Sequence, residues 1–117
     1  MSHHLLLVNA DESATFQREQ VMEAVKTIPG FEMSSPSSFQ GCAIRGEFKY
    51  QDDSTFFELS DDDTRISLSG TGIAALAFAL VFQRRITEPL RAFDSSYTFD
   101  VCLNDVHDLG NFQSIAK

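Results

Sequence analysis

Apolar and polar residues alternate with a period of two along several segments, as they do in β-strands that bury one face. The clearest segment is 41–50, whose side chains divide into an apolar and a polar set: Cys42, Ile44, Phe48 and Tyr50 against Ala43, Arg45, Glu47 and Lys49. Further strands are predicted over 55–60, 65–69 and 95–103, the last with these side chains facing inward: Tyr97, Phe99, Val101 and Leu103. Four consecutive apolar residues within 4–9 predict a central strand with a neighbour on each edge.

Two segments have the apolar spacing of helices. The first is predicted to begin at Asp11, an N-cap residue, and to end near Thr27 before Pro29-Gly30. The second runs from Gly72 to about Ile86 and is apolar on every side, which predicts burial on more than one side. We expect a loop over 31–38 with a short edge strand at 31–33, and a tail without regular period over 104–117.

The predicted order of elements is β-α-β-β-β-α-β. Three of the five strands are polar on one face, so we expect both helices to cover the other face and leave this one open to solvent. The sequence of 117 residues therefore predicts a single α+β domain over 1–117, with 104–117 as a C-terminal tail. Its expected architecture is a two-layer sandwich, ferredoxin-like with one added strand and a mainly antiparallel sheet.

The apolar second helix leaves two alternatives for what covers it. Phe78 and Phe82 lie largely opposite the face that carries Ile73, Leu76 and Leu80. Either the C-terminal tail or the first helix packs against the exposed side, or Phe78 and Phe82 form the interface of a homodimer.

The net charge of −8 repels phosphate backbones, so we expect no nucleic-acid partner and favour a basic protein. From Gln51 to Asp63 the chain has acids and no lysine or arginine. These acids are either solvated turns or a recognition patch for a basic partner: Asp52, Asp53, Glu58, Asp61, Asp62 and Asp63.

Localisation follows from the cysteines and from the apolar runs. The two cysteines fall in predicted strands, where we expect reduced thiols. No secretory signal is recognisable, and the apolar run of the second helix is too short to span a bilayer. We therefore expect a cytoplasmic protein that does not bind membranes.

Gly70-x-Gly72-x-x-Ala75 follows a strand and opens a helix, as a dinucleotide fingerprint does. The preceding strand belongs to an antiparallel meander, and too few residues follow for the parallel units that such a site needs. We therefore interpret the glycines as a tight corner. Free N–H groups at Gly70, Thr71 and Gly72 remain a candidate site for a small anion.

Other catalytic or metal-binding patterns are weak. Asp105, His107 and Asp108 lie close together in sequence, but without the spacing of a metal site. No nucleophile-elbow, metalloprotease or phosphate-loop motif occurs in the sequence. We predict a protein that is not an enzyme and that has no metal or cofactor.

The second half of the chain resembles a group of small uncharacterised bacterial proteins, some of them assigned as immunity proteins of polymorphic toxin systems. Three segments carry the resemblance: Ile66–Gly72, Leu76–Leu80 and Arg91–Asp100. It implies a cytoplasmic protein that binds one toxin tightly and blocks it.

Three hypotheses follow for function, and the one with the weakest support in the sequence is an enzyme that uses Asp105, His107 and Asp108 with a metal. The first is a non-catalytic protein-binding domain, of the immunity type, that sequesters a basic toxin or another protein through its acidic loops and polar sheet face. The alternative is a dimeric small-ligand or regulatory domain that binds an anion near Gly70–Gly72.

Overall fold

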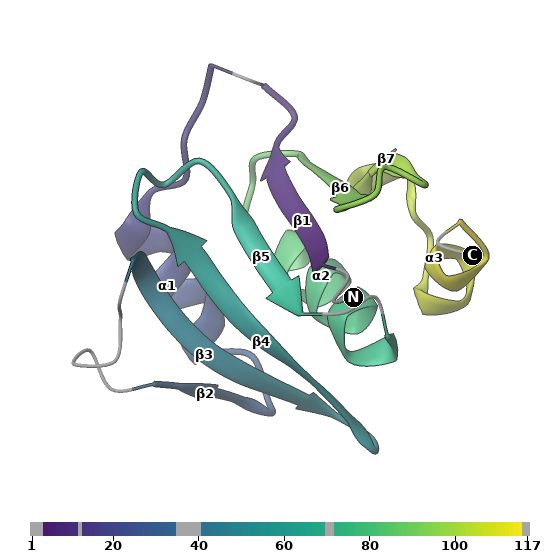
Figure 1. The fold of residues 1–117 in the computed structure, drawn as a ribbon, viewed down its shortest axis with the longest axis horizontal. Helices are drawn as coiled ribbons and strands as arrows, with labels where there is room; N and C mark the ends of the chain where they lie inside the picture. The colour runs from purple at the N-terminus through teal and green to yellow at the C-terminus, as the bar shows by residue number, and fades with distance from the viewer. Residues whose placement is uncertain (1–3, 12, 35–40, 70–71, 116–117) are drawn as a thin grey trace.

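A seven-stranded antiparallel sheet forms one layer of the protein, and helices form the other (Figure 1). The structure is a computed structural model that describes residues 4–11, 13–34, 41–69 and 72–115. In chain order the elements are β1 (His4–Asn9), α1 (Arg18–Lys26), β2 (Phe31–Met33), β3 (Cys42–Tyr50), β4 (Asp53–Ser60), β5 (Ile66–Ser69), α2 (Ile73–Arg85), β6 (Leu90–Asp94), β7 (Asp100–Cys102), the 3₁₀ turn η2 (Leu103–Asp105) and α3 (Leu109–Ile115). The predicted α+β class is confirmed.

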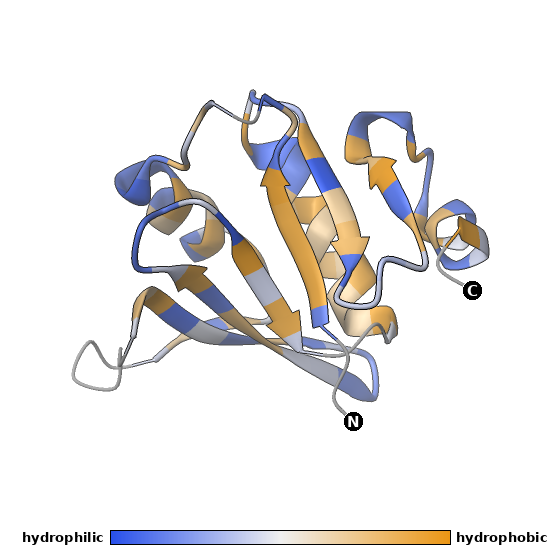
Figure 2. Cartoon of the chain, turned by 45° about the horizontal axis from the view of Figure 1, so that its top comes forward, coloured by the Kyte–Doolittle hydropathy of each residue, from blue (hydrophilic) through white to orange (hydrophobic). Residues whose placement is uncertain are grey.

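The strands lie in the order β2-β3-β4-β5-β1-β6-β7, and each neighbouring pair is antiparallel. The prediction that β1 is a central strand is confirmed, since β5 and β6 flank it. Helix α2 connects these two flanking strands and therefore crosses β1. Figure 2 shows β1 as an almost continuous apolar strand in front of the largely apolar α2.

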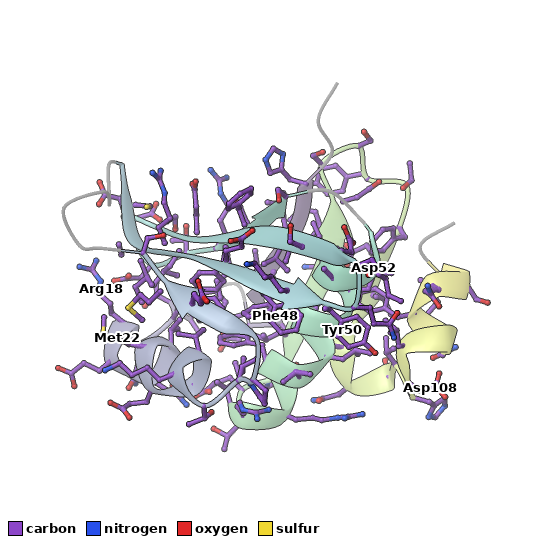
Figure 3. All side chains as sticks on the ribbon, turned by 90° about the horizontal axis from the view of Figure 1, so that it is seen from below. Arg18, Met22, Phe48, Tyr50, Asp52 and Asp108 are labelled. Atoms are coloured by element: carbon purple, nitrogen blue, oxygen red, sulfur yellow. The ribbon has the colours of Figure 1, made fainter. Side chains whose placement is uncertain are left out.

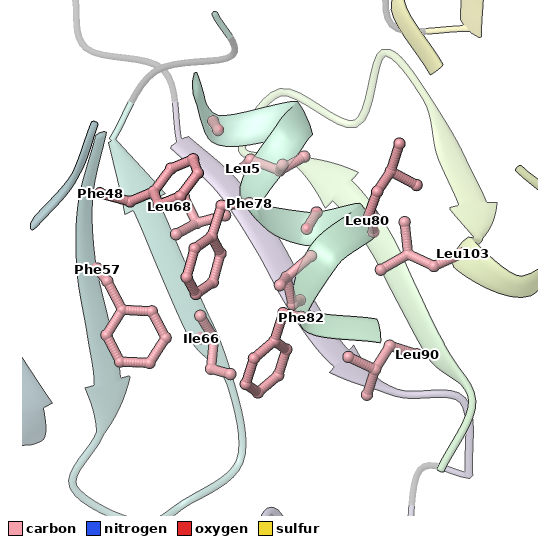
Figure 4. Close-up of a cluster of buried hydrophobic side chains, with 14 of the residues drawn as sticks. Leu5, Phe48, Phe57, Ile66, Leu68, Phe78, Leu80, Phe82, Leu90 and Leu103 are labelled. Atoms are coloured by element: carbon pink, nitrogen blue, oxygen red, sulfur yellow. The ribbon is translucent and has the colours of Figure 1, made fainter. Parts of the chain in front are cut away.

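The core lies between the sheet and the helices and contains a cluster of phenylalanine rings. The ring of Phe78 on α2 lies 5.3 Å from that of Phe57, 5.4 Å from that of Phe48 and 5.6 Å from that of Phe82 (Figure 4). Phe57, Phe78 and Phe82 are each 0% exposed. These rings join two strands to α2 and so fix the helix on the sheet.

The C-terminal tail folds against the outer side of α2. Helix α3 and the turn η2 both contact α2, and they contribute Phe112 at 0% and Leu103 at 2% exposure to the core. Phe78 and Phe82 instead face the sheet. These two are therefore core side chains, and in this fold they present no surface to a second copy of the chain.

The predicted position of the last strand is wrong. Instead of one strand over 95–103, the chain forms β6, a turn, and then the short β7. Asp94 accepts hydrogen bonds from both the N–H and the hydroxyl of Thr98, which fixes the turn between the two strands. Tyr97, predicted to face inward, lies in that turn and is 71% exposed.

The first helix begins later than predicted. Asp11 does not cap it, because its carboxylate accepts hydrogen bonds from the N–H and the hydroxyl of Ser13, at 3.0 and 2.7 Å. Such a local turn satisfies the side chain without a helix. The helix starts only at Arg18, and Gln17 is its N-cap residue.

Candidate functional site

The face of the sheet that points away from the helices is here called the open face. Figure 3 shows the helices on one side of the sheet and side chains projecting from the other. Buried and less buried positions alternate along the strands, and the less buried ones identify the residues of the open face. Its central side chains are His4, Leu6, Val8, Arg45, Glu47, Phe56, Glu58, Ser67, Ser69, Arg91 and Phe93.

The strand register arranges the open face in rows. One row crosses five strands through directly paired residues: Arg45, Glu58, Ser67, Leu6 and Phe93. Arg45 and Glu58 form an ion pair at 3.3 Å. The row therefore begins charged on β3 and β4 and becomes apolar on β1 and β6.

Two aromatic side chains stand out from this face. Phe56 and Tyr97 are the exposed large hydrophobic residues of the described chain, at 57% and 71%. Tyr97 stacks on Phe93, with ring centroids 4.9 Å apart, so it lies on the open face as well. Exposed aromatic rings on one surface are typical of sites that bind a partner.

Tyr97 is held in place by the turn that carries it. Its φ of 55° lies in the left-handed region, which is uncommon for a residue other than glycine. The hydrogen bonds from Thr98 to Asp94 stabilise this turn. Burial alone would raise the pKa of Asp94, but the hydrogen bonds from Thr98 and from the N–H of Phe99 outweigh it and lower that pKa.

Two hollows lie on the open face, both in contact with β1. One has a volume of about 340 Å³ and is lined by His4, Leu6, Phe56, Glu58, Arg65, Ser67, Ser69 and Ser95. The other has a volume of about 320 Å³ and is lined by Val8, Asn9, Ala14, Thr15, Thr64, Arg91, Phe93 and Tyr97. Each hollow thus contains one of the two exposed aromatic residues.

The acids predicted to bind a partner lie at three places. Asp52 and Asp53 are at one end of β4, Asp61–Asp63 follow the other end, and Glu58 lies on the open face. Seven steps of about 3.3 Å along β4 separate its ends by about 23 Å. The six acids therefore do not form one continuous patch.

Asp53 has an internal role at the start of α2. Its Oδ2 accepts a hydrogen bond from the N–H of Ala74 at 3.0 Å. A Cβ atom at Gly72 would lie only 2.6 Å from this oxygen, so glycine makes room for the contact. At Gly72, the candidate anion site therefore already contains a carboxylate of the same chain, that of Asp53. Gly70 and Thr71 lie outside the described residues.

Two of the acids after β4 are also engaged within the chain. Asp62 accepts hydrogen bonds from the hydroxyls of Thr64 and Ser60, at 2.7 and 2.8 Å, and these two bonds lower its pKa. Asp63 forms an ion pair with Arg18 at 3.2 Å. Asp61 and Asp52 are exposed, and they remain the acids most available to a partner.

The other residues considered for metal binding or catalysis do not form a site. Within the described residues no group of three or more histidine, cysteine or acidic side chains is placed to hold a metal ion. Asp108 instead accepts a hydrogen bond from the N–H of Asn111, in the first turn of α3.

Cys42 and Cys102 are free thiols on β3 and β7, with four strands between them in the sheet order. Of the helices in the described part of the chain, none combines the length and apolarity needed to cross a membrane.

Sequence reasoning missed both exposed aromatic residues. A signal for Phe56 was present, because it alternates with Thr55 and Phe57 and so shares the polar side of β4 with Glu58. No such signal marks Tyr97, whose exposure depends on the turn between β6 and β7.

Comparison of this protein with protein-family models, with curated proteins and with solved structures finds no match.

Proposed function

We propose that this chain is a non-catalytic domain that binds a protein partner through the open face of its sheet. The observation that carries the proposal is that Phe56 and Tyr97 are both exposed and lie on the open face. The helices lie on the other side of the sheet (Figure 3). Aromatic side chains are enriched among the residues that dominate binding energy in protein interfaces.

The charges of the open face support recognition rather than catalysis. Arg45 pairs with Glu58, and Arg91 pairs with Asp100. Because each pair joins opposite charges, the two pairs add little net charge to the open face. They also place polar groups beside its apolar centre, which is formed by Leu6 and Phe93. A polar rim around an apolar centre is the ordinary anatomy of a protein interface.

The preference for a basic partner rests on the charge of the whole chain. The net charge is −8, and the exposed Asp52 and Asp61 lie beyond opposite ends of β4. Such a field accelerates the encounter with a basic protein, while the open face supplies the contact. An immunity-type inhibitor of a basic toxin is the form of this function that the sequence resemblance favours.

We also infer that the fold is a variant of the ferredoxin-like plan. The adjacent strands β4, β5, β1 and β6, with α1 and α2, supply its six elements. The remaining strands, β2, β3 and β7, are additions at the two edges.

Photo-crosslinking in the cell that expresses the protein tests the proposed function. A photoreactive phenylalanine analogue is placed at Phe56, at Tyr97, or at Glu23, an exposed residue of α1 that serves as the matched control. We expect the same protein to be crosslinked from positions 56 and 97 and not from position 23. Crosslinking from position 23 alone, or no crosslinked protein at any position, would contradict the proposal.

A further inference from the structure

Phe56 is an exposed aromatic residue on β4, an interior strand of the sheet. Its side chain is 57% exposed, although its neighbours along the strand, Thr55 and Phe57, are 1% and 0% exposed. Its backbone N–H donates a hydrogen bond to Oγ of Ser69 at 2.8 Å, which holds the residue in the sheet. None of the ring–ring contacts between described residues includes Phe56. The ring therefore offers an aromatic surface to a group from outside the chain.

The sheet places two carboxylates beside this ring. Glu47 on β3 is directly paired with Phe56, and such pairs have Cβ atoms about 4.5–5.5 Å apart. Glu58 is two residues further along β4, about 7 Å away, and lies on the same face. It forms an ion pair with Arg45, yet its side chain stays 46% exposed. The ring thus has one carboxylate across the strands and another along its own strand.

The charge of Glu47 is not compensated by an ion pair. Its partner on the edge strand β2 is Glu32, and like charges directly opposite each other destabilise a sheet. Among the described residues, neither of these two acids forms an ion pair. The nearest cations along β3 are Arg45, which pairs with Glu58, and Lys49, which is exposed. A cation from outside the chain would relieve the repulsion between the two acids.

A guanidinium group matches an aromatic ring beside a carboxylate. It is a planar, delocalised cation that stacks on aromatic faces, and its N–H groups form a fork that fits a carboxylate. An ammonium group is a compact, strongly hydrated point charge and gains less from the ring. A neutral group would leave the carboxylates without a counter-charge. The net charge of −8 also favours the approach of a cation.

We propose that Phe56, Glu47 and Glu58 form a docking point for an arginine side chain of the protein partner. The guanidinium group stacks on Phe56 and donates hydrogen bonds to Glu47, and Glu58 contributes a second negative charge. Arg65 lines the hollow that Phe56 shares with β5 and β1, so the incoming cation lies on the β3 side of the ring. That the arginine belongs to a protein rests on the proposed function, whereas the recognition of a guanidinium group does not.

Titration of the full chain with three small probes, followed by two-dimensional amide NMR, tests the docking point. The probes are the Nα-acetyl amides of arginine, citrulline and lysine. Citrulline has nearly the shape of arginine without its charge, and lysine has the charge without the planar group. We expect the arginine probe to shift the signals of residues 47, 56 and 58, and to bind at least fivefold more tightly than the citrulline probe and twofold more tightly than the lysine probe.

Three results of this titration would overturn the proposal. The first is equal affinity for the arginine and citrulline probes, and the second is a lysine probe that binds as tightly as the arginine probe. The third is a set of shifts confined to another surface of the protein.

Substitutions separate the ring, the carboxylate and the net charge. Phe56→Leu keeps an apolar side chain but removes the ring, and Glu47→Gln keeps the shape but removes the charge. Each should weaken binding of the arginine probe at least threefold. Glu23→Gln on α1 is the matched control, because it removes the same charge from an exposed position on another surface, and it should leave the affinity within 1.5-fold. Equal weakening by Glu23→Gln and Glu47→Gln would show that the probe responds only to net charge, and the docking point would be wrong.

The probe experiment also separates the two proposals. If the arginine probe does not bind while a partner is crosslinked from positions 56 and 97, the docking point is wrong and the protein-binding function stands. If the probe binds as expected and no protein is crosslinked, the three residues recognise a free guanidinium compound and the assignment to a protein partner is wrong.

Discussion

The carboxylate of Asp53 accepts a hydrogen bond from the backbone N–H of Ala74 at 3.0 Å, which joins the start of β4 to the start of α2. The first N–H groups of a helix lack partners within the helix, and a carboxylate there also interacts favourably with the helix dipole. One acid from the most acidic segment of the chain is therefore a structural residue.

Asp53→Ala should lower the free energy of unfolding by about 1 kcal/mol, because it removes this contact at the helix N-terminus. Urea unfolding measures the change. Asp52→Ala is the matched control, since Asp52 is the exposed neighbour, and it should change the free energy by less than about 0.5 kcal/mol. Equal effects of the two substitutions would contradict the role assigned to Asp53.

Gly72→Ala should destabilise the unmodified chain but not the Asp53→Ala variant. The added Cβ would lie 2.6 Å from Oδ2 of Asp53, and the φ of Gly72, −74°, is acceptable to alanine. The cost therefore arises from the carboxylate alone. A double-mutant cycle of unfolding free energies isolates this coupling, and additive effects would show that the contact is not formed.

Phe78→Ala should lower the free energy of unfolding by about 3–5 kcal/mol, because the ring is fully buried among other aromatic side chains. Phe56→Ser, on the open face, should cost far less. Urea unfolding compares the two variants. If Phe78 instead formed a dimer interface, its replacement would change the sedimentation behaviour of the protein more than its stability.

The stability of the protein should decrease as the pH falls below about 4. The pKa of Asp94 in the folded protein lies below its usual value of 3.8, so the folded state holds the charged form more strongly than the unfolded state does. Its contribution is present above the unfolded pKa and is lost as the pH falls through the folded pKa. Unfolding free energies at pH 7 and pH 3 measure this loss. Asp94→Asn should reduce it, whereas Asp52→Asn should retain it in full.

The regular part of the fold was predictable because its side chains repeat with clear periods. Alternation identified β3, β4 and β5, and the uninterrupted apolar run of β1 identified the central strand. Strand β6 was missed because Ala92, Phe93 and Asp94 are all buried, which leaves no alternation to detect. This strand has apolar Phe93 on the open face and the acid Asp94 on the covered face, so it shows neither the alternation of β3 nor the apolar run of β1.

The candidate site depended on contacts that the sequence does not display. Asp53 and Ala74 are far apart in the chain, so no local pattern distinguishes this acid from its exposed neighbour Asp52. The exposure of Tyr97 follows from the hydrogen bonds between Asp94 and Thr98, which replace a strand by a turn. Long-range capping and side-chain-stabilised turns are decided by the tertiary structure rather than by periodicity.

The affinity of the crosslinked partner for Phe56→Ser tests the central claim most directly. Calorimetry on the purified pair compares this variant with Glu23→Ser, an exposed substitution on α1. Binding through the open face predicts that Phe56→Ser raises Kd at least tenfold, a loss of about 1.4 kcal/mol, while Glu23→Ser leaves Kd within twofold. An unchanged Kd for Phe56→Ser, together with a weakened Glu23→Ser, would place the interface on the helices and contradict the account.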